Sequence, residues 1–278
     1  MEILRFKKII WFINFCLTVG ILLFVNFFAA FADQKYKVYF HNPESNINNY
    51  ALLKKEFDKY LSDYGNFEFQ PFSNRDTFEK HIIAGADVIL VVSSWYYKIL
   101  SEKFSIKAAL IGVLNGKTTH RKVLCVNEKV TGPDLLENNT VASSGSEDYT
   151  RKILIQMLGE EERKNVYSLK ILTVPKDIDA LMAVGFGIAD LALTTENSLI
   201  KLKKINPKQY NMLRQLAISD EILLPIIAVR EQSNVEIEML VKIIEDMGTS
   251  PDGKKNLKML GLDGWKRLNM SEREFLEK

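Results

Sequence analysis

The sequence has few of the residues that hold metal ions or form covalent cross-links. Its 278 residues include two cysteines and three histidines. Cys16 lies in the N-terminal apolar run described below, so loss of that run leaves Cys125 alone and excludes an internal disulfide. Because zinc sites use several Cys and His ligands, we expect no metal site.

Sequence signatures of common enzyme classes are also missing. We find no Cys and His pair typical of a thiol nucleophile, no HExxH motif and no phosphate-loop lysine. Asp177, Asp190 and Glu196 could form a carboxylate site, but nothing in the sequence fixes their geometry. We therefore expect no enzyme, no catalytic residues and no cofactor.

Neither sign of charge dominates, since 37 Lys and Arg residues face 35 Asp and Glu residues. Without residues 1–32, which carry more basic than acidic side chains, the chain is formally neutral. Proteins that bind nucleic acid usually concentrate basic residues on one face. The balance gives no reason to expect nucleic acid or an anionic membrane surface as a partner.

The N-terminal segment has the features of an export signal. Basic residues come first, then an apolar run from Ile9 to Ala30, and Ala30-Phe31-Ala32 has the small-x-small form of a cleavage site. We predict a signal peptide at 1–32 and a periplasmic protein. The apolar run is rather long for a signal peptide, so an uncleaved anchor holding the protein at the membrane, facing the periplasm, is the alternative.

After residue 35, short apolar runs alternate with amphipathic helical stretches, an order that predicts the α/β class. The predicted strands lie at 36–42, 67–72, 86–94, 121–128, 140–144, 168–175, 188–195 and 223–231. The predicted helices lie at 50–65, 76–85, 147–158, 177–187, 235–247 and 251–260. We expect two lobes, each a mainly parallel sheet flanked by helices, joined by two hinge strands. Lobe 1 is placed at 33–120 and 222–278, and lobe 2 at 121–221.

Four motifs occur in an order and spacing that resemble one known family. They are "PDLLENNTVASSGS", "DIDALMAVGFGIADLAL", "LRQLAISDEILLPIIAVR" and "SPDGKKNLKMLGLDGWKRL". From about Tyr36 to Trp265 the chain resembles the periplasmic substrate-binding proteins of phosphate, phosphite and phosphonate ABC transporters. The resemblance implies the type 2 periplasmic binding-protein fold, a two-lobed clamp that closes on a small solute and delivers it to a membrane permease.

The loop before the predicted helix 147–158 is the first candidate binding element. Free N–H groups at a helix start attract anions, and the resemblance implies that Ser143, Ser144 and Ser146 donate to a phosphoryl group. A capping box with Ser144 as N-cap and Glu147 at the third helical position is the competing interpretation, and one loop can serve both purposes.

Two acidic residues in the same helical turn affect which ligand can bind. Glu147 and Asp148 would repel a phosphate dianion, so we predict weak or absent binding of inorganic phosphate. A zwitterionic or neutral ligand would be repelled less.

Further candidates lie on other strands. Ser93 and Ser94 follow a parallel strand, at the edge where ligands of α/β sheets bind, and Tyr96 belongs to an aromatic cluster that either walls in a ligand or packs in the core. The resemblance adds Asp190, which either meets a ligand's amine or caps local backbone, and Thr194. The sequence departs from the phosphonate binders where they often carry a histidine, because Asp177 is the nearest residue here.

Together these residues predict an exported solute-binding protein with an ABC permease as partner. It would capture a small ligand, such as an organophosphonate or a related oxyanion, in an interlobe cleft. A ligand-sensing or lipid-carrying protein that uses the same clamp without an importer is the alternative, and an uncleaved anchor would favour it.

Overall fold

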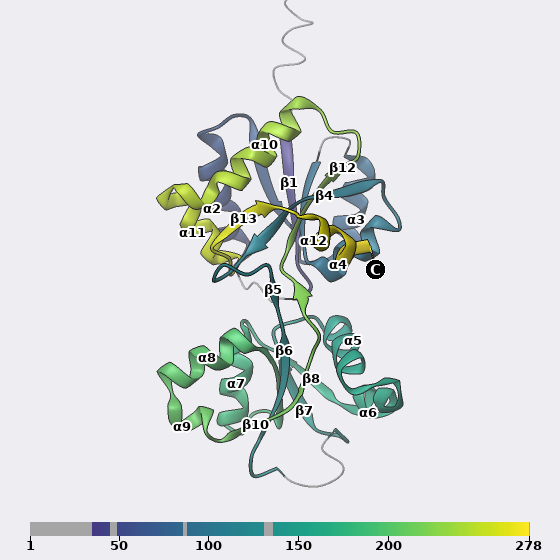
Figure 1. Cartoon of the computed structure of the whole chain (residues 1–278), viewed down its shortest axis with the longest axis vertical. Coiled ribbons are helices and arrows are strands. Elements are labelled where there is room, and N and C mark those ends of the chain that lie inside the picture. Colours follow the sequence, from purple (N-terminus) through teal and green to yellow (C-terminus); the bar gives the residue numbers. More distant parts are fainter. Residues whose placement is uncertain (1–34, 45–48, 86–87, 131–135, 278) are drawn as a thin grey trace, which may run out of the picture.

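The chain folds around two separate β-sheets that lie one above the other along its longest axis (Figure 1). This computed structural model describes residues 35–44, 49–85, 88–130 and 136–277. The predicted signal segment, 1–32, lies outside the described residues. None of the helices within those ranges is long and apolar enough to span a membrane.

Lobe 1 denotes the six-stranded sheet and the helices packed on it. Its strand order is β13-β4-β12-β3-β1-β2. These strands are β1 (Tyr36–His41), β2 (Phe67–Pro71), β3 (Val88–Val92), β4 (Ile106–Val113), β12 (Ile226–Arg230) and β13 (Gly264–Arg267). Its helices are α2 (Tyr50–Ser62), α3 (Arg75–Ala84), α4 (Ser94–Ser101), α10 (Val235–Glu245), α11 (Pro251–Met259) and α12 (Met270–Glu277).

Alternation along β1 shows why helices cover both faces of this sheet. Val38 and Phe40 belong to one buried cluster, which includes side chains of α2 and α10. Tyr39, between them, belongs to a second cluster with side chains of α3 and α4. Successive strand residues point to opposite faces, so a strand with consecutive buried apolar residues, such as Val38 to Phe40, needs helices on both sides.

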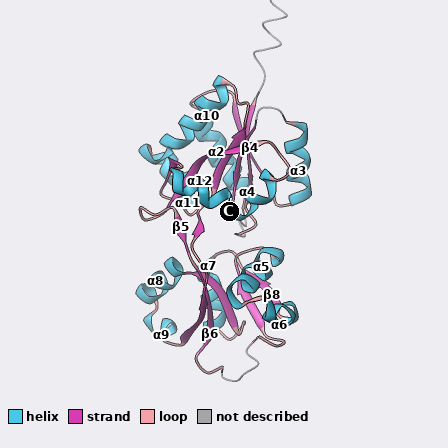
Figure 2. Cartoon of the chain, turned by 45° about the vertical axis from the view of Figure 1, so that its right-hand side comes forward, coloured by secondary structure: helices cyan, strands magenta, loops and turns pink. Residues whose placement is uncertain are grey.

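Lobe 2 denotes the five-stranded sheet, of order β10-β6-β9-β7-β8, and its helices. The strands are β6 (Lys122–Asn127), β7 (Thr140–Ser143), β8 (Lys170–Thr173), β9 (Leu191–Thr195) and β10 (Leu213–Ile218). The helices are α5 (Glu147–Leu158), α6 (Arg163–Ser168), α7 (Asp177–Gly185), α8 (Glu196–Ile205) and α9 (Pro207–Tyr210). Apolar clusters lie on both sides of the sheet, as in lobe 1. Figure 2 shows helices flanking this sheet.

The two lobes are joined by a two-stranded ribbon. β5 (Thr119–His120) pairs antiparallel with β11 (Ile222–Leu223), and this ribbon lies between the sheets in Figure 1. β4 leads into β5 and on to β6, while β10 leads into β11 and back to β12. The chain therefore crosses between the lobes along paired strands.

The predicted α/β class, with two sheets and two hinge strands, is confirmed, but the prediction of mainly parallel sheets is wrong. β1 is parallel to β2 and β3, and β7 is parallel to β8 and β9. The strands that enter each lobe from the hinge run against their neighbours. β12 is antiparallel to β3 and β4, and β6 is antiparallel to β9 and β10. Both sheets are mixed for this reason.

Candidate functional site

Polar side chains from both lobes meet where the parallel strands end. β1 and β3 in lobe 1, and β7 and β9 in lobe 2, direct their carboxyl ends toward the other lobe, the edge at which α/β sheets bind ligands. We call the buried and half-buried polar residues gathered here the interlobe polar cluster. Its members are Glu44, Ser93, His120, Lys122, Ser144, Tyr149 and Asp177.

The turn after β1 brings lobe 1 onto lobe 2. The side chain of Asn42 accepts the N–H of Glu44 at 2.9 Å, which holds a tight turn around Pro43. The Pro43 carbonyl oxygen then accepts the N–H of Ser146 at 2.7 Å, and the Glu44 carbonyl lies 3.4 Å from the Ser144 hydroxyl. Glu44 is 7% exposed. Glu44 of lobe 1 is thus buried against residues 143–146 of lobe 2, which join β7 to α5 and which we call the serine loop.

Within the serine loop, the predicted capping box at Ser144 is wrong. The N-cap is Ser146, whose hydroxyl accepts the N–H of Tyr149 at 3.3 Å, because α5 begins two residues later than a cap at Ser144 requires. The Ser143 hydroxyl accepts the Gly145 N–H at 3.1 Å and the Thr150 hydroxyl at 2.8 Å. These contacts fix the loop's shape, and Ser144 is left to face lobe 1 and α7.

The acidic residues at the start of α5 do not face the cluster. The Glu147 carboxylate pairs with Arg151 at 2.7 Å and that of Asp148 with Lys152 at 3.6 Å, and both carboxylates are mostly exposed. Solvent and these cations screen their charge. The basis on which repulsion of phosphate is predicted, the charge of Glu147 and Asp148, is therefore weak in the structure, and the prediction stays untested.

The cation of the cluster is already paired. Lys122 is 3% exposed, and its ammonium lies 3.0 Å from Asp177 Oδ1 and 5.8 Å from the centre of the Tyr149 ring. Asp177 also accepts the Ser144 hydroxyl at 2.9 Å, and its backbone carbonyl accepts the Thr194 hydroxyl at 2.9 Å. Asp177 thus engages the buried cation of the cluster.

Burial controls the protonation of Glu44. Its pKa is raised from 4.5 to about 7, mainly by desolvation and in smaller part by the nearby Asp177 charge. The Lys122 ammonium and the hydroxyls of Ser93 and Tyr149 oppose this shift by favouring the carboxylate. The Tyr149 contact is loose, because neither Glu44 Oε1 nor Tyr149 Oη has a partner within hydrogen-bond geometry. Burial also raises the pKa of Tyr149, so its hydroxyl stays protonated.

His120, on the hinge strand β5, is neutral beside Glu44. Burial and then the Lys122 charge lower its pKa to about 4. Its Nε2 lies 3.9 Å from Glu44 Oε2 but makes no hydrogen bond. With both carboxylates ionised, the cluster therefore holds two negative charges, those of Glu44 and Asp177, against the one positive charge of Lys122.

Ser93, Ser144 and Thr194 are the predicted site residues that lie in the cluster or support it directly. Ser143 and Ser146 shape the serine loop behind it. Ser94 instead donates its hydroxyl to the carbonyl of Leu223 on hinge strand β11, at 2.7 Å.

The structure does not bring Tyr96 and Asp190 into the cluster. The Tyr96 hydroxyl donates to Glu79 of α3 at 2.8 Å, and its ring packs in the lobe 1 core, because the third residue of α4 points back over the sheet. Asp190 precedes β9 and accepts the Thr140 N–H at 2.8 Å, at the opposite end of the strand from Thr194. Trp95 packs edge-on against the Tyr149 ring, 5.6 Å between centres, as part of a core.

Four cluster residues were missed by sequence reasoning, namely Glu44, His120, Lys122 and Tyr149. Lys122 could have been found, since it opens the fully apolar strand "KVLCV" and a charge at a buried position needs a partner. The sequence around Glu44 does not indicate that this residue is buried, because its burial depends on contact with a loop one hundred residues away.

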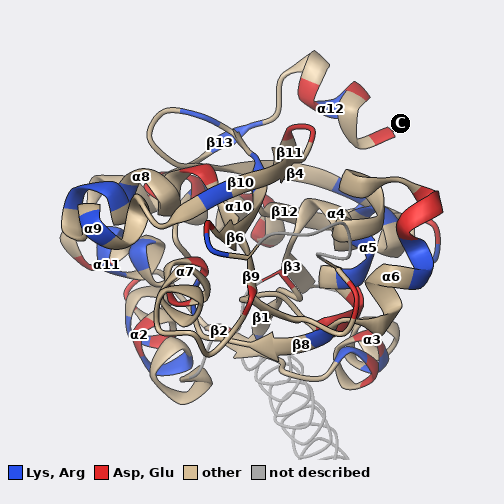
Figure 3. Cartoon of the chain, turned by 90° about the horizontal axis from the view of Figure 1, so that it is seen from below, with Lys and Arg blue, Asp and Glu red and all other residues tan. Residues whose placement is uncertain are grey.

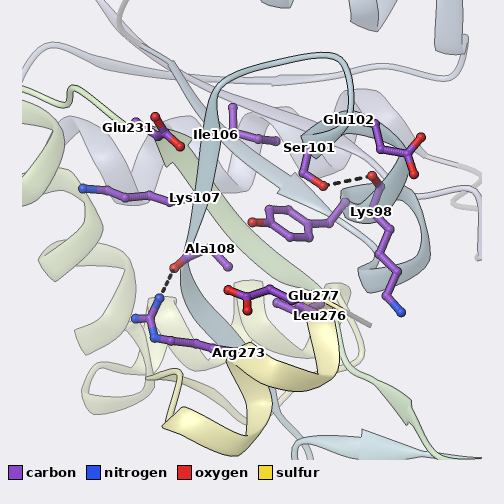
Figure 4. Close-up of a pocket in the computed structure, with 11 residues that line it drawn as sticks. Lys98, Ser101, Glu102, Ile106, Lys107, Ala108, Glu231, Arg273, Leu276 and Glu277 are labelled. Carbon is purple, nitrogen blue, oxygen red and sulfur yellow. Dashed lines mark hydrogen bonds between the residues drawn. The ribbon is translucent and has the colours of Figure 1, made fainter.

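Outside the interlobe polar cluster, the described residues offer weaker candidates for a ligand or metal site. A hollow of about 420 Å³ in lobe 1 lies between α4, β4 and α12, with Tyr97 and Arg273 among its lining residues, and shares no residue with the cluster (Figure 4). Basic and acidic segments alternate over the outer helices in the view of Figure 3. Within the described ranges, no group of three or more His, Cys, Asp or Glu side chains is placed to hold a metal ion.

Comparison with known proteins identifies the family. Residues 40–272 match the family described as "ABC transporter, phosphonate, periplasmic substrate-binding protein". No curated protein sequence matches the chain.

Solved structures share its fold at low sequence identity. A binding-protein component of an ABC phosphonate transporter from Pseudomonas aeruginosa has a TM-score of 0.62 at 14% identity, with 88% of this chain and 86% of that chain covered. PhnD1 from Prochlorococcus marinus, solved with methylphosphonate, has a TM-score of 0.60 at 12% identity, with 88% and 96% covered. A Xanthomonas citri protein solved with ATP has a TM-score of 0.61 at 14% identity, with 88% and 95% covered. The shared architecture is the type 2 periplasmic binding-protein fold.

Proposed function

The chain belongs to the phosphonate-type periplasmic substrate-binding proteins of ABC transporters, and we propose that its lobes capture a small solute at the interlobe polar cluster. Residues 1–32 direct export to the periplasm, and the liganded protein delivers the solute to the permease of an ABC importer. Ser93 contacts the solute from lobe 1, and Ser144 and Tyr149 contact it from lobe 2.

One observation carries this proposal. Glu44 Oε1, Tyr149 Oη and His120 Nε2 are buried between the lobes without hydrogen-bond partners. Buried polar atoms are nearly always paired, because an unpaired one costs about 1–3 kcal/mol. Three such atoms from both lobes and the hinge, gathered at the strand ends, are typical of a place where a polar ligand completes the hydrogen bonding.

The charges of the cluster determine which net charge a ligand can carry. Lys122 is held by Asp177, and His120 is uncharged at neutral pH, so no free cation faces a ligand from within the cluster. A phosphonate dianion would lie close to Glu44 without compensation. We therefore propose a neutral or zwitterionic small solute, with groups that donate hydrogen bonds to Glu44 and Tyr149.

Native mass spectrometry of the protein purified from its own host tests this function. A retained small polar adduct supports solute capture, whereas a retained lipid supports the lipid-carrier alternative. Calorimetry then follows the identified solute on the wild type and on Ser93→Ala, with Ser101→Ala as control because the Ser101 hydroxyl is exposed on α4. Equal affinity of wild type and Ser93→Ala would place the binding site elsewhere.

A further inference from the structure

The serine loop, which resembles the anion-binding element of the family, is covered in this chain by a segment of lobe 1. The Ser146 N–H, which points outward from the start of α5, donates to Pro43 at 2.7 Å. The Ser144 hydroxyl faces the Glu44 carbonyl at 3.4 Å and the Asp177 carboxylate at 2.9 Å. Two groups that could hold an oxyanion are therefore already engaged by acceptors of the protein.

We propose that Glu44 is the specificity-determining residue of this site, excluding tetrahedral dianions from the serine loop while accepting neutral or zwitterionic solutes. This inference rests on the proposed function and names the group that selects the solute. The Glu44 carboxylate acts in two ways. Its charge repels anions, and its buried position, where Oε1 has no hydrogen-bond partner, favours solutes that carry a donor.

The first effect is the charge of Glu44. Glu44 is 7% exposed, so solvent screens its carboxylate poorly. The carboxylate interacts with Lys122, Asp177 and Tyr149, and Tyr149 and Asp177 flank the serine loop, so an anion at that loop would be repelled by its charge. The charged and titratable groups that face the Glu44 carboxylate are Lys122 of β6, His120 of β5, Asp177 of α7 and Tyr149 of α5. Of these only Lys122 is cationic at neutral pH, and Asp177 already neutralises it at 3.0 Å.

The second effect is the buried position of Glu44, which determines the ligand groups that its carboxylate can bind. Its Oε1 is buried without a partner, as is the neighbouring Tyr149 hydroxyl. A solute that brings an N–H or O–H donor satisfies the carboxylate oxygen and offsets the cost of burying it. A fully deprotonated oxyanion brings only acceptors and leaves Oε1 unsatisfied.

The test compares two carboxylates at the same loop. Glu44→Gln removes the buried charge while keeping the side chain's shape, and Glu147→Gln removes an exposed charge from the first turn of α5. Sulfate and methylphosphonate are titrated calorimetrically into wild type and both variants near pH 8, about one unit above the Glu44 pKa, where its carboxylate is mostly ionised. We expect weak binding to wild type, severalfold and up to about tenfold tighter binding to Glu44→Gln, and no change for Glu147→Gln. Equal affinities for wild type and Glu44→Gln, or an equal gain in Glu147→Gln, would overturn the inference.

A second measurement needs no variant and covers the case in which Glu44→Gln fails to fold. Sulfate stays a dianion across the mildly acidic range, so its binding to wild type reports only on the protein. Acidification from about pH 8 to about pH 5.5 protonates Glu44 and leaves His120 neutral, since their pKa values are about 7 and about 4. Sulfate affinity should rise at least severalfold, and an unchanged affinity contradicts the inference. Both measurements use added anions, so failure to find a host-derived solute would count against the proposed function alone.

Discussion

The N–H of Ser146 in lobe 2 donates to the carbonyl oxygen of Pro43 in lobe 1, at 2.7 Å. Both groups belong to the backbone, so the contact depends on the position of the two loops and not on side-chain identity. It joins the turn after β1 to the start of α5 and places Glu44 beside Ser144. The two lobes therefore meet through a direct bond at the helix end that would otherwise attract an anion.

The buried pair Lys122–Asp177 should be among the most sensitive positions for stability. Lys122→Met removes the cation that lies 3.0 Å from Asp177 and that favours the charged form of Glu44. Two carboxylates then lie close together without compensation, and we expect a loss of about 3–5 kcal/mol in the free energy of unfolding. Urea denaturation near neutral pH measures it.

The double variant Lys122→Met/Asp177→Asn serves as the matched control for that prediction. Removing the second charge should recover part of the loss, because the remaining residues carry only the Glu44 charge. A double variant as unstable as Lys122→Met alone would show that packing of the lysine stem, and not the pair, determines the effect.

The pH dependence of the unfolding free energy should show the effect of burying the Glu44 carboxyl. Its folded-state pKa is raised from 4.5 to about 7, so the protonated side chain contributes stability below about pH 4.5 that is lost as pH rises through 7. The shift corresponds to roughly 3 kcal/mol. Glu44→Gln should therefore match wild type near pH 4.5 and exceed its unfolding free energy near pH 8. Wild type as stable as Glu44→Gln near pH 8 would contradict the burial argument.

His120 should change the unfolding free energy with pH in the direction opposite to Glu44. Its folded-state pKa is lowered from 6.5 to about 4, so its contribution is present above about pH 6.5 and is lost as pH falls through 4. Between these limits the effects of His120 and Glu44 oppose one another in the wild type. His120→Gln should consequently lose stability more steeply than wild type as pH rises from about 4 to 6.5, measured by denaturation at several pH values. Parallel curves for the two proteins would exclude a buried neutral histidine.

Much of the fold could be predicted because apolar periodicity determines which residues are buried. The predicted helix 147–158 has the same bounds as α5, and the predicted start of α7 at Asp177 is also correct. Every position from Val88 to Val92 is buried, as a short, fully apolar run indicates. The mixed direction of the sheets could not be predicted, since it depends on how the chain returns through the hinge.

The site was less predictable, for reasons that differ between residues. Asp190 could have been excluded, because it precedes β9 and the binding edge lies at the strand's other end. Tyr96 follows the strand end as expected, but only the direction of α4 decides that its hydroxyl reaches Glu79 and not the cluster. Glu44 lies in a polar turn, and its burial arises from packing of the two lobes.

The Ser144 hydroxyl should contribute modestly to the contact between the lobes. Ser144→Ala removes the donor to Asp177 at 2.9 Å and the nearby contact with the Glu44 carbonyl. We expect a loss of about 1–2 kcal/mol in unfolding free energy, since a hydrogen bond to a charged group is broken. Ser101→Ala, which removes an exposed contact with the Lys98 carbonyl, should change it by less than about 0.5 kcal/mol. Equal losses would mean that Ser144 has no special role.

Gly145 should be intolerant of any side chain because of the ring beneath it. A Cβ at this position would overlap the Tyr149 ring, which is fully buried and lies beside Glu44. Gly145→Ala must displace that ring or the serine loop, and overpacking of this kind costs about 1–3 kcal/mol. Gly264→Ala is the matched control, because a Cβ there meets no atom within 4 Å. Urea denaturation should show a clear loss for Gly145→Ala and little change for Gly264→Ala. Tyrosine fluorescence would report the ring's displacement, and if Gly145→Ala proves as stable as the control, the serine loop can move away from Tyr149 at little cost.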